Sequence, residues 1–392
     1  MRVLFISSPA ATHFLPMLPL VKALQAAGHE VLVTGQPDVT GPAEAAGLAT
    51  VTHGDAFHYE DLCGGKGPRG PRPIETVGRP PAQQIDGAAQ MWRNHTSYHL
   101  PDYLELARDW KADLVVSDHM DFAAPIVGEV LGIPSVEHRW GVNPTSTSML
   151  RMTLMWLGPL CGRLGLDSVP GPSLILDPAP PALRSTDAPE GRPIRPLPHT
   201  DGRAPWAYAT SPGAPGCRVA VALGGHTLEL GGAPLVRIVV DVLERTGGVE
   251  AVVSAPPRFR EAIGALPKTM SYTDETAPGV LFPGADLVVH HGGAGSTLGA
   301  AALGVPQLVL PQVGDQFIAG DKVADAGAGI SLDSAGLQNN DTHLTDAVRA
   351  LLSDPGYRQD AARLRQQIQE MPGAAEAVGV LEDLVSHQTV RA

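Results

Sequence analysis

One stretch decides the fold: Asp286-Leu-Val-Val-His-His-Gly-Gly-Ala-Gly-Ser-Thr-Leu298, which has the pattern of a buried strand, a turn of small residues and a helix. The glycines of the turn let a ligand approach the backbone closely, and Ser296 and Thr297 are expected to cap the helix. Free N–H groups at the helix start and the positive end of the helix dipole suit a phosphate. The stretch therefore predicts an anion-binding turn in an α/β domain with a parallel sheet.

The spacing of this turn excludes two common nucleotide-binding motifs. It is not Gly-x-x-x-x-Gly-Lys-Ser/Thr, which disfavours an ATP-hydrolysing P-loop, and it is not the Gly-x-Gly-x-x-Gly of dinucleotide binders. A plain strand–helix connection with a histidine in the core is the alternative interpretation of the same residues. The residues of the turn alone leave the two interpretations about equally favoured.

Alternating strand and helix patterns extend from this stretch in both directions and predict a parallel sheet in each half of the chain. A chain of 392 residues is too long for one ordinary core. Prolines gather in segment 177–216, which suits an extended connection between domains. We therefore expect an N-terminal domain over residues 1–200 and a C-terminal domain over residues 217–374.

The composition limits the class of protein. A net charge of −13 argues against a nucleic-acid surface, which needs clustered positive charge. No apolar run reaches the ~18–20 residues of a membrane span, and a strand pattern begins directly after Met1, so we expect a cytoplasmic protein. The three cysteines lack the spacing of a metal site or a disulfide framework, and we expect no metal and no cofactor.

The turn and the residues after it resemble a known family. His290-His-Gly-Gly-Ala-Gly-Ser-Thr, followed by Ala302-Leu-Gly-Val-Pro-Gln and Pro311-Gln-Val-Gly-Asp-Gln, is similar to the donor-binding signature of family-1 glycosyltransferases, in particular the actinomycete natural-product enzymes. The resemblance implies the GT-B fold, in which two Rossmann-like, doubly wound α/β domains face each other across a cleft. It implies that the first domain binds the acceptor, and that a last helix, residues 375–392, returns to that domain.

The same resemblance implies which residues bind the sugar donor. Asp315 and Gln316 would hydrogen-bond the sugar hydroxyls. A second glycine turn, Val221-Ala-Leu-Gly-Gly-His-Thr, contributes Gly225 near the phosphate. The donor diphosphate would be held by this glycine and by the residues of the main turn: His291, Gly293, Ala294, Gly295, Ser296 and Thr297.

Two departures from the plant relatives bear on the nucleotide. The acidic residue that binds both ribose hydroxyls in those enzymes corresponds to Gly299 here. The tryptophan that stacks on uracil is absent from the corresponding stretch, Ser271-Tyr-Thr-Asp-Glu-Thr-Ala-Pro-Gly. Both differences predict a dTDP-sugar as the donor.

His13 and Asp118 are the candidate catalytic residues. His13 follows the first strand and Asp118 ends a later one, and ligands collect at the carboxyl ends of parallel strands. A histidine there can take the proton from an acceptor hydroxyl, and Asp118 could orient it through its other ring nitrogen. The resemblance supports this pair and implies inversion at the anomeric carbon. Helix capping is the alternative role of each residue, and Asp121 is the alternative partner of His13.

The acceptor side is marked by large and apolar side chains. The run Met149-Leu-Arg-Met-Thr-Leu-Met-Trp has helical spacing and is either ordinary core or a pliable wall for a large apolar acceptor. The residues that we expect to contact the acceptor are Phe14, Trp92, His138, Met149 and Met152.

Together these residues predict an inverting glycosyltransferase that moves a deoxysugar from a dTDP-sugar to a hydroxyl of a hydrophobic aglycone of polyketide, macrolide or enediyne type. A non-hydrolysing nucleotide-sugar epimerase and a non-catalytic activator subunit are the alternatives. The presence of His13, Asp118 and His291 together argues against the second. A homodimer and an activator protein are compatible with the prediction.

Overall fold

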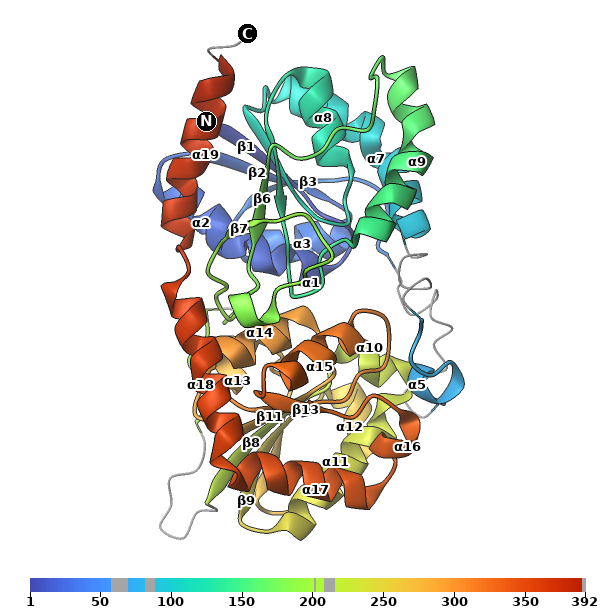
Figure 1. Cartoon of the computed structure of the whole chain (residues 1–392), viewed down its shortest axis with the longest axis vertical. Helices are drawn as coiled ribbons and strands as arrows, with labels where there is room; N and C mark the ends of the chain where they lie inside the picture. Colours follow the sequence, from blue (N-terminus) through green and yellow to red (C-terminus); the bar gives the residue numbers. More distant parts are fainter. Residues whose placement is uncertain (58–69, 82–88, 201, 208–215, 390–392) are drawn as a thin grey trace.

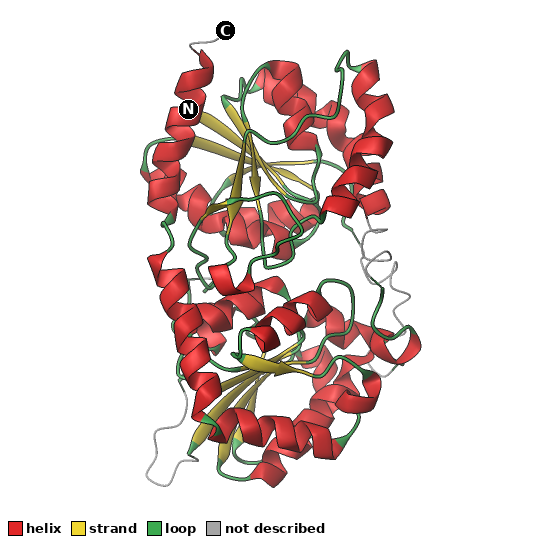
Figure 2. Cartoon of the chain, in the orientation of Figure 1, coloured by secondary structure: helices red, strands yellow, loops and turns green. Residues whose placement is uncertain are grey.

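The computed structural model describes residues 1–57, 70–81, 89–200, 202–207 and 216–389. The described chain forms two α/β units, one above the other in Figure 1, each with a parallel sheet between layers of helices (Figure 2). This is the doubly wound, two-domain arrangement that the sequence predicts.

The first sheet has seven strands in the order β3-β2-β1-β4-β5-β6-β7. Its central strands are apolar runs that are covered on both faces by helices, as parallel sheets require. The sequence pattern does not reveal β3, β6 and β7, which lie toward the edges. The strands are β1 (Arg2–Ile6), β2 (Glu30–Gly35), β3 (Ala49–Thr52), β4 (Leu114–Asp118), β5 (Ser135–His138), β6 (Leu174–Asp177) and β7 (Arg192–Pro193).

Helices cover both faces of the first sheet, and one of them comes from the far end of the chain. α19, Ala374–Thr389, packs against α2, Leu18–Ala26 (Figure 1). Its Val378 and Leu381 belong to the same buried cluster as residues of β1 and α2. The other helical segments of this domain are α1 (Ala11–Phe14), η1 (Leu15–Met17), α3 (Pro37–Ala45), α5 (Pro73–Thr76), α7 (Ala89–Asp109), α8 (Ala123–Leu131), α9 (Thr147–Arg163) and η2 (Pro181–Leu183).

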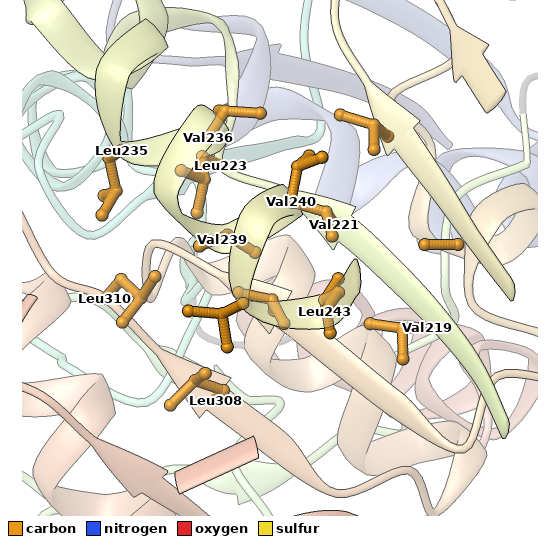
Figure 3. Packing of buried hydrophobic residues seen from close by; sticks show 14 of the residues in the cluster. Val219, Val221, Leu223, Leu235, Val236, Val239, Val240, Leu243, Leu308 and Leu310 are labelled. Carbon is orange, nitrogen blue, oxygen red and sulfur yellow. The ribbon is translucent and has the colours of Figure 1, made fainter. Parts of the chain in front are cut away.

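The second sheet has six strands in the order β10-β9-β8-β11-β12-β13. Figure 3 shows α11, Ala233–Thr246, above this sheet, where Val236, Val239 and Leu243 pack against Val219 and other strand residues. The strands are β8 (Cys217–Ala222), β9 (Val249–Ser254), β10 (Met270–Thr273), β11 (Leu287–His290), β12 (Gln307–Val309) and β13 (Gly329–Ser331).

The remaining helical segments of the second domain flank its sheet and lead to the end of the chain. They are α10 (Gly225–Thr227), η3 (Leu228–Gly232), α12 (Pro257–Ile263), α13 (Pro278–Leu281), α14 (Ala294–Leu303), α15 (Gln316–Asp325), α16 (Ala335–Gln338), α17 (Asp341–Ser353) and α18 (Pro355–Glu370). Among the described residues, no helix combines the length and apolar character that a membrane span requires.

The two domains contact each other through a buried apolar cluster. Val142 and Leu183 of the first domain lie in it with Leu298 and Leu364 of the second. The proline-rich segment 177–216 contributes to the first sheet as well as to the connection, because β7 pairs with β6 inside it. The segments that follow the carboxyl ends of the two sheets also meet, because a Cβ on Gly141, after β5, would be 2.6 Å from the Cβ of Ala294, after β11.

Candidate active site

The glycine-rich turn leads from β11 into α14, and its cap differs from the prediction. The N-cap is Gly293, which has no side chain to cap the helix. Ser296 and Thr297 lie inside the first helical turn and do not cap it. The Thr297 hydroxyl and its backbone N–H both donate to the carbonyl of Gly293, at 3.0 and 2.9 Å, and Thr297 is buried. The first N–H groups of a helix have no acceptor within it, so the donors for an anion are those of Ala294, Gly295 and Ser296.

His291 lies between two glycines. A Cβ atom on Gly224 would be 2.8 Å from the His291 Cε1 atom, and one on Gly293 would be 2.5 Å from its Nε2 atom. Burial lowers the pKa of His291 to about 4, so the ring is neutral near pH 7. The two glycines thus hold a neutral imidazole beside the start of α14, where it can meet the same anion.

His290 stabilises the turn from within the domain. It is fully buried, and its Nδ1 atom accepts a 3.0 Å hydrogen bond from the backbone N–H of Gly292. The proton is therefore on Nε2, which lies 2.9 Å from the Gln307 Oε1 atom. Of the two adjacent histidines, His290 has a structural role and His291 lies beside the anion site.

Asp315 and Gln316 stand where the loop after β12 enters α15: Asp315 is the N-cap of this helix and Gln316 its first residue. The Gln316 Oε1 atom accepts hydrogen bonds from the N–H groups of Gln312 and Val313, at 2.8 and 3.2 Å. A Cβ on Gly292 would be 2.6 Å from the Gln316 carbonyl oxygen, so the loop and the turn are in direct contact. Burial raises the pKa of Asp315 to about 6. The backbone at Asp315 and Gln316 is thus adjacent to the turn that forms the anion site.

His13 and Asp118 lie on the first domain and are joined through a third residue. The Ser8 Oγ atom is 2.6 Å from His13 Nδ1 and donates to Asp118 Oδ2 at 2.9 Å. Asp118 therefore reaches the other ring nitrogen of His13 through Ser8 and not by direct contact. Asp118 is fully buried, and the same oxygen also accepts from the Ser8 backbone N–H at 2.6 Å and from Ser7 Oγ at 3.1 Å.

The bridge fixes the tautomer of His13. A hydroxyl has one proton, and since Ser8 donates it to the carboxylate, Ser8 accepts a hydrogen bond from His13 Nδ1–H. The His13 Nε2 atom then carries the free lone pair of a general base. Burial lowers the pKa of His13 to about 4, against the opposing charge of Asp118, and His226 of the second domain adds to the lowering.

Aromatic rings surround His13. Its imidazole stacks on the Trp140 indole, and the Trp92 ring lies 5.8 Å away. His119 lies against the same indole at 3.8 Å, so Trp140 is in contact with two imidazoles. Asp121, the alternative partner of His13, instead lies 3.7 Å from His95 Nδ1.

A pocket of about 360 Å³ opens on the first domain beside this aromatic group. Trp92 lines it and also packs with Met149 in a small buried cluster that Met91 and Trp156 cover. Trp92 thus connects the pocket with His13. The full lining is Pro9, Gln36, Gly54, Asp55, Ala56, Phe57, Met91, Trp92, Asn94, His95, Tyr98 and His99.

Of the residues expected at the acceptor, Trp92 alone lines this pocket, and three others lie neither in its lining nor in the cluster of Trp92 and Met149. Phe14 is fully buried in the core of the first domain, because its ring faces the cluster of β1 and α2. His138 is buried, with its Nδ1 atom 2.8 Å from the Arg139 carbonyl oxygen. Met152 lies on α9, half-buried, outside the cluster of Trp92 and Met149. Of the five residues expected at the acceptor, the structure therefore brings together only Trp92 and Met149.

Two residues next to His13 were not predicted from the sequence. Ser8 follows β1 at its carboxyl end, so the rule that selected His13 could have selected Ser8 as well. Trp140 follows β5, and no sequence pattern signals its stacking on His13.

The chain is similar to known proteins over nearly its whole length. The models of the erythromycin biosynthesis protein CIII-like N-terminal and C-terminal domains match residues 22–224 and 239–384. L-demethylnoviosyl transferase of Streptomyces niveus is 31% identical over 99% of this chain and 98% of its own. Elloramycin glycosyltransferase ElmGT of Streptomyces olivaceus is 31% identical over 97% of each chain.

Solved structures give the same result. Spinosyn rhamnosyltransferase SpnG in complex with thymidine diphosphate has a TM-score of 0.86 and 34% identity, over 97% of this chain and 100% of that one. Its complex with spinosyn aglycone has a TM-score of 0.85 at 34% identity, with the same coverage. The GT-B fold and the enzyme class predicted from the sequence are confirmed. The chain belongs to the erythromycin biosynthesis protein CIII-like family of natural-product glycosyltransferases, the GT-B, nucleotide-sugar-dependent enzymes of family 1.

Proposed function

We propose that this enzyme transfers a deoxysugar from a dTDP-sugar to a hydroxyl of a hydrophobic natural-product aglycone, with inversion at the anomeric carbon and His13 as the general base. One observation carries the proposal. The Nδ1 atom of His13 is held by Ser8 and Asp118, and its base nitrogen Nε2 makes no hydrogen bond among the described interactions. His226 of the second domain is close enough to lower the pKa of His13, so the base lies where the two domains meet.

Two features support a thymidine donor. The SpnG structure, similar over nearly the whole chain, was determined with thymidine diphosphate. A Cβ on Gly299 would be 2.7 Å from Pro278 Cβ, so α13 occupies the place where a side chain of residue 299 would extend. Residue 299 therefore has no carboxylate to bind the 2′-hydroxyl of a uridine ribose, and Pro278 leaves no space for a side chain at this position.

The acceptor site that we propose is the pocket beside Trp92 and His13. Its aromatic and thioether side chains suit a large apolar ring system of polyketide, macrolide or enediyne type. SpnG was also determined with spinosyn aglycone, and ElmGT is named for elloramycin. Met149, behind Trp92, supports the wall of the pocket.

The proposed reaction is a single displacement. His13 Nε2 removes the proton as the acceptor oxygen attacks the anomeric carbon, on the face opposite the leaving diphosphate. The charge that develops on the diphosphate meets the N–H groups of Ala294, Gly295 and Ser296, the helix dipole and His291. The proposal includes no metal and no cofactor beyond the nucleotide sugar, because the positive end of the helix dipole, the N–H groups at the helix start and a hydrogen bond from neutral His291 can stabilise the leaving diphosphate.

The His13→Ala variant tests the proposal. Transfer should fall by about 10²–10⁴ while dTDP affinity, measured by calorimetry, stays at the wild-type value. Products from a panel of dTDP-sugars and aglycones are read by mass, and the anomeric configuration by NMR coupling constants. Unchanged turnover, or UDP binding as tight as dTDP binding, would contradict the base or the donor respectively.

Two partner expectations accompany the proposal: a homodimer and an activator protein. Sedimentation of the purified chain tests the first. Transfer by the purified chain without any added protein would exclude a strict requirement for the second.

A further inference from the structure

A short segment of the first domain's sequence lies on the second domain. Figure 1 shows α5, Pro73–Thr76, beside the lower domain and near α16. The backbone of the second domain is shaped to receive it: Gly231 has a φ of +87°, and a Cβ there would run into the carbonyl oxygen of Gly70. Half of residues 70–81 are exposed, but Arg72 and Ile74 are each only 2% exposed. Arg72 is thus a charged side chain of one domain that is buried against the other.

The guanidinium of Arg72 makes hydrogen bonds with residues of the second domain. Its Nη1 atom donates to Gln338 Oε1 at 2.6 Å and to Gln312 Oε1 at 3.4 Å. Its Nη2 atom donates to Asn339 Oδ1 and, at 3.0 Å, to Glu75 Oε1 within its own segment. Glu75 also accepts from Asn339 Nδ2 at 2.8 Å, which closes the network. Arg72 therefore meets one carboxylate and three amides, without bulk water around its charge.

The two glutamines that receive Arg72 hold the loop of Asp315 and Gln316. Gln338 is fully buried and donates through Nε2 to the carbonyl of Pro311, at 3.0 Å, and to that of Leu332, at 2.8 Å. Gln312 donates to Gln338 Oε1 at 2.8 Å, and its backbone N–H donates to Gln316 Oε1. Both polar atoms of the Gln338 amide therefore have partners. The start of the loop, at Pro311 and Gln312, is joined to Arg72 by this hydrogen-bond network.

We infer that Arg72 is a positioning residue for the donor sugar: through Gln338 and Gln312 it holds the loop that presents Asp315 and Gln316, and so couples the acceptor domain to sugar recognition. The inference rests on the proposed function of that loop. Arg72 is separated from the diphosphate turn by this loop, so its loss should affect recognition of the sugar and spare that of the nucleotide. A merely structural role would weaken both equally.

The experiment compares wild-type protein with Arg72→Met, which keeps most of the side-chain length and removes the hydrogen bonds. Calorimetry gives the affinities for dTDP and for dTDP-glucose. We expect the ratio of dTDP-glucose affinity to dTDP affinity to fall about tenfold in Arg72→Met, with dTDP affinity unchanged. Arg72→Lys, which retains the charge and can still reach one glutamine, should fall between the two. It also supplies the measurement if the methionine variant does not fold.

Arg79→Ala is the matched control from the same segment. Arg79 forms exposed ion pairs with Asp321 and Asp333 of the second domain and lies 5.8 Å from the ring centroid of Phe317, but among the described interactions it makes no contact with Gln312 or Gln338. This variant should keep the wild-type ratio of affinities, because exposed pairs add little. An equal loss of both affinities in Arg72→Met, or the same altered ratio in Arg79→Ala, overturns the inference.

Hydrogen exchange separates failure of this inference from failure of the proposed function. In ligand-free protein, the amides of Gln312 and Val313 should exchange faster in Arg72→Met than in wild type, because Gln316 no longer accepts from them steadily. Wild-type protein that binds neither dTDP nor dTDP-glucose contradicts the donor proposal, whatever the exchange shows. Unchanged exchange at these amides contradicts the role of Arg72, whatever the donor is.

Discussion

The imidazole of His13 lies flat on the indole of Trp140, with 3.6 Å between the ring centroids and 6° between the planes. Stacking fixes the tilt of the ring, and the Ser8 hydrogen bond fixes its rotation about the axis of the side chain. The base nitrogen is thus aimed by two independent contacts, one apolar and one polar. Their separate effects can be measured.

Ser8→Ala should slow transfer strongly and destabilise the protein only slightly. Without the bridging hydroxyl, His13 loses the acceptor that keeps its proton on Nδ1, so we expect kcat to fall about tenfold or more. Ser7→Ala is the matched control, because Ser7 donates to the same oxygen of Asp118 and makes no hydrogen bond to His13. Both variants should lose about 1 kcal/mol of unfolding free energy. Equal kcat values for the two variants would contradict the bridging role.

Gly295→Ala should make the protein more stable and its donor binding weaker. Gly295 is in the first turn of α14, and a Cβ there meets nothing within 4 Å. Alanine in a helix is favoured over glycine by about 0.5–1 kcal/mol, but its methyl group occupies the approach to the diphosphate.

Gly379→Ala on α19 is the control for this variant, since a Cβ there also has open space. It should give a similar rise in the melting temperature and leave dTDP affinity unchanged. If Gly295→Ala also leaves dTDP affinity unchanged, the diphosphate does not bind against this turn.

Gly299→Glu should not produce a uridine-specific enzyme. The added side chain would collide with Pro278 before it could reach a ribose, so the variant should lose stability. Even Gly299→Ala should lose about 1–3 kcal/mol of unfolding free energy through overpacking. Thermal denaturation and competition between UDP and dTDP measure the two effects. A stable Gly299→Glu protein that prefers UDP would show that α13 moves aside.

Acid should destabilise the protein from about pH 6.5 downward. Burial lowers the pKa of seven histidines from the ordinary 6.5, so below this pH the unfolded chain binds protons that the folded chain does not, and the free energy of unfolding decreases as the pH falls. Burial raises the pKa of Asp121, Glu137 and Asp315, so these carboxyls increase the free energy of unfolding as the pH falls. They are only three, however, and the seven histidines outnumber them. The seven are His13, His95, His99, His119, His138, His290 and His291.

Urea denaturation at pH 7, 6 and 5 and constant ionic strength checks this prediction. Each net proton taken up on unfolding changes the free energy of unfolding by about 1.4 kcal/mol per pH unit. A midpoint that stays constant or rises between pH 7 and pH 5 would contradict it.

Local patterns were predictable from the sequence, and long-range contacts were not. The strand, turn and helix around His291 are consecutive, so their order and spacing indicate both the fold and an anion site. β7 is two residues long and includes a proline, and it is a strand only because it pairs with β6. No periodicity marks such a segment.

The candidate site shows the same division. Parallel pairing of β1 with β4 places Ser7, Ser8 and Asp118 together at the carboxyl ends of these strands. The sequence predicted this location for His13 and Asp118. The same rule also applies to Ser8, but which atom joins His13 to Asp118 depends on side-chain rotamers, and the sequence does not indicate these. Arg72 contacts Gln338 from 266 positions away, on a segment without regular structure before α5, and only the folded chain reveals the contact.

The position of α19 has a consequence for how the protein is made. The first domain needs Val378 and Leu381 to complete its core, and His29 lies 3.0 Å from Glu382 of the same helix. A ribosome delivers these residues only after it has synthesised the whole second sheet. Until α19 has been synthesised, the face of the first domain that it covers stays exposed to water, so this domain cannot complete its core before the second sheet has been made. The enzyme reaches its final form in the reverse of the usual order, with the first domain closed last.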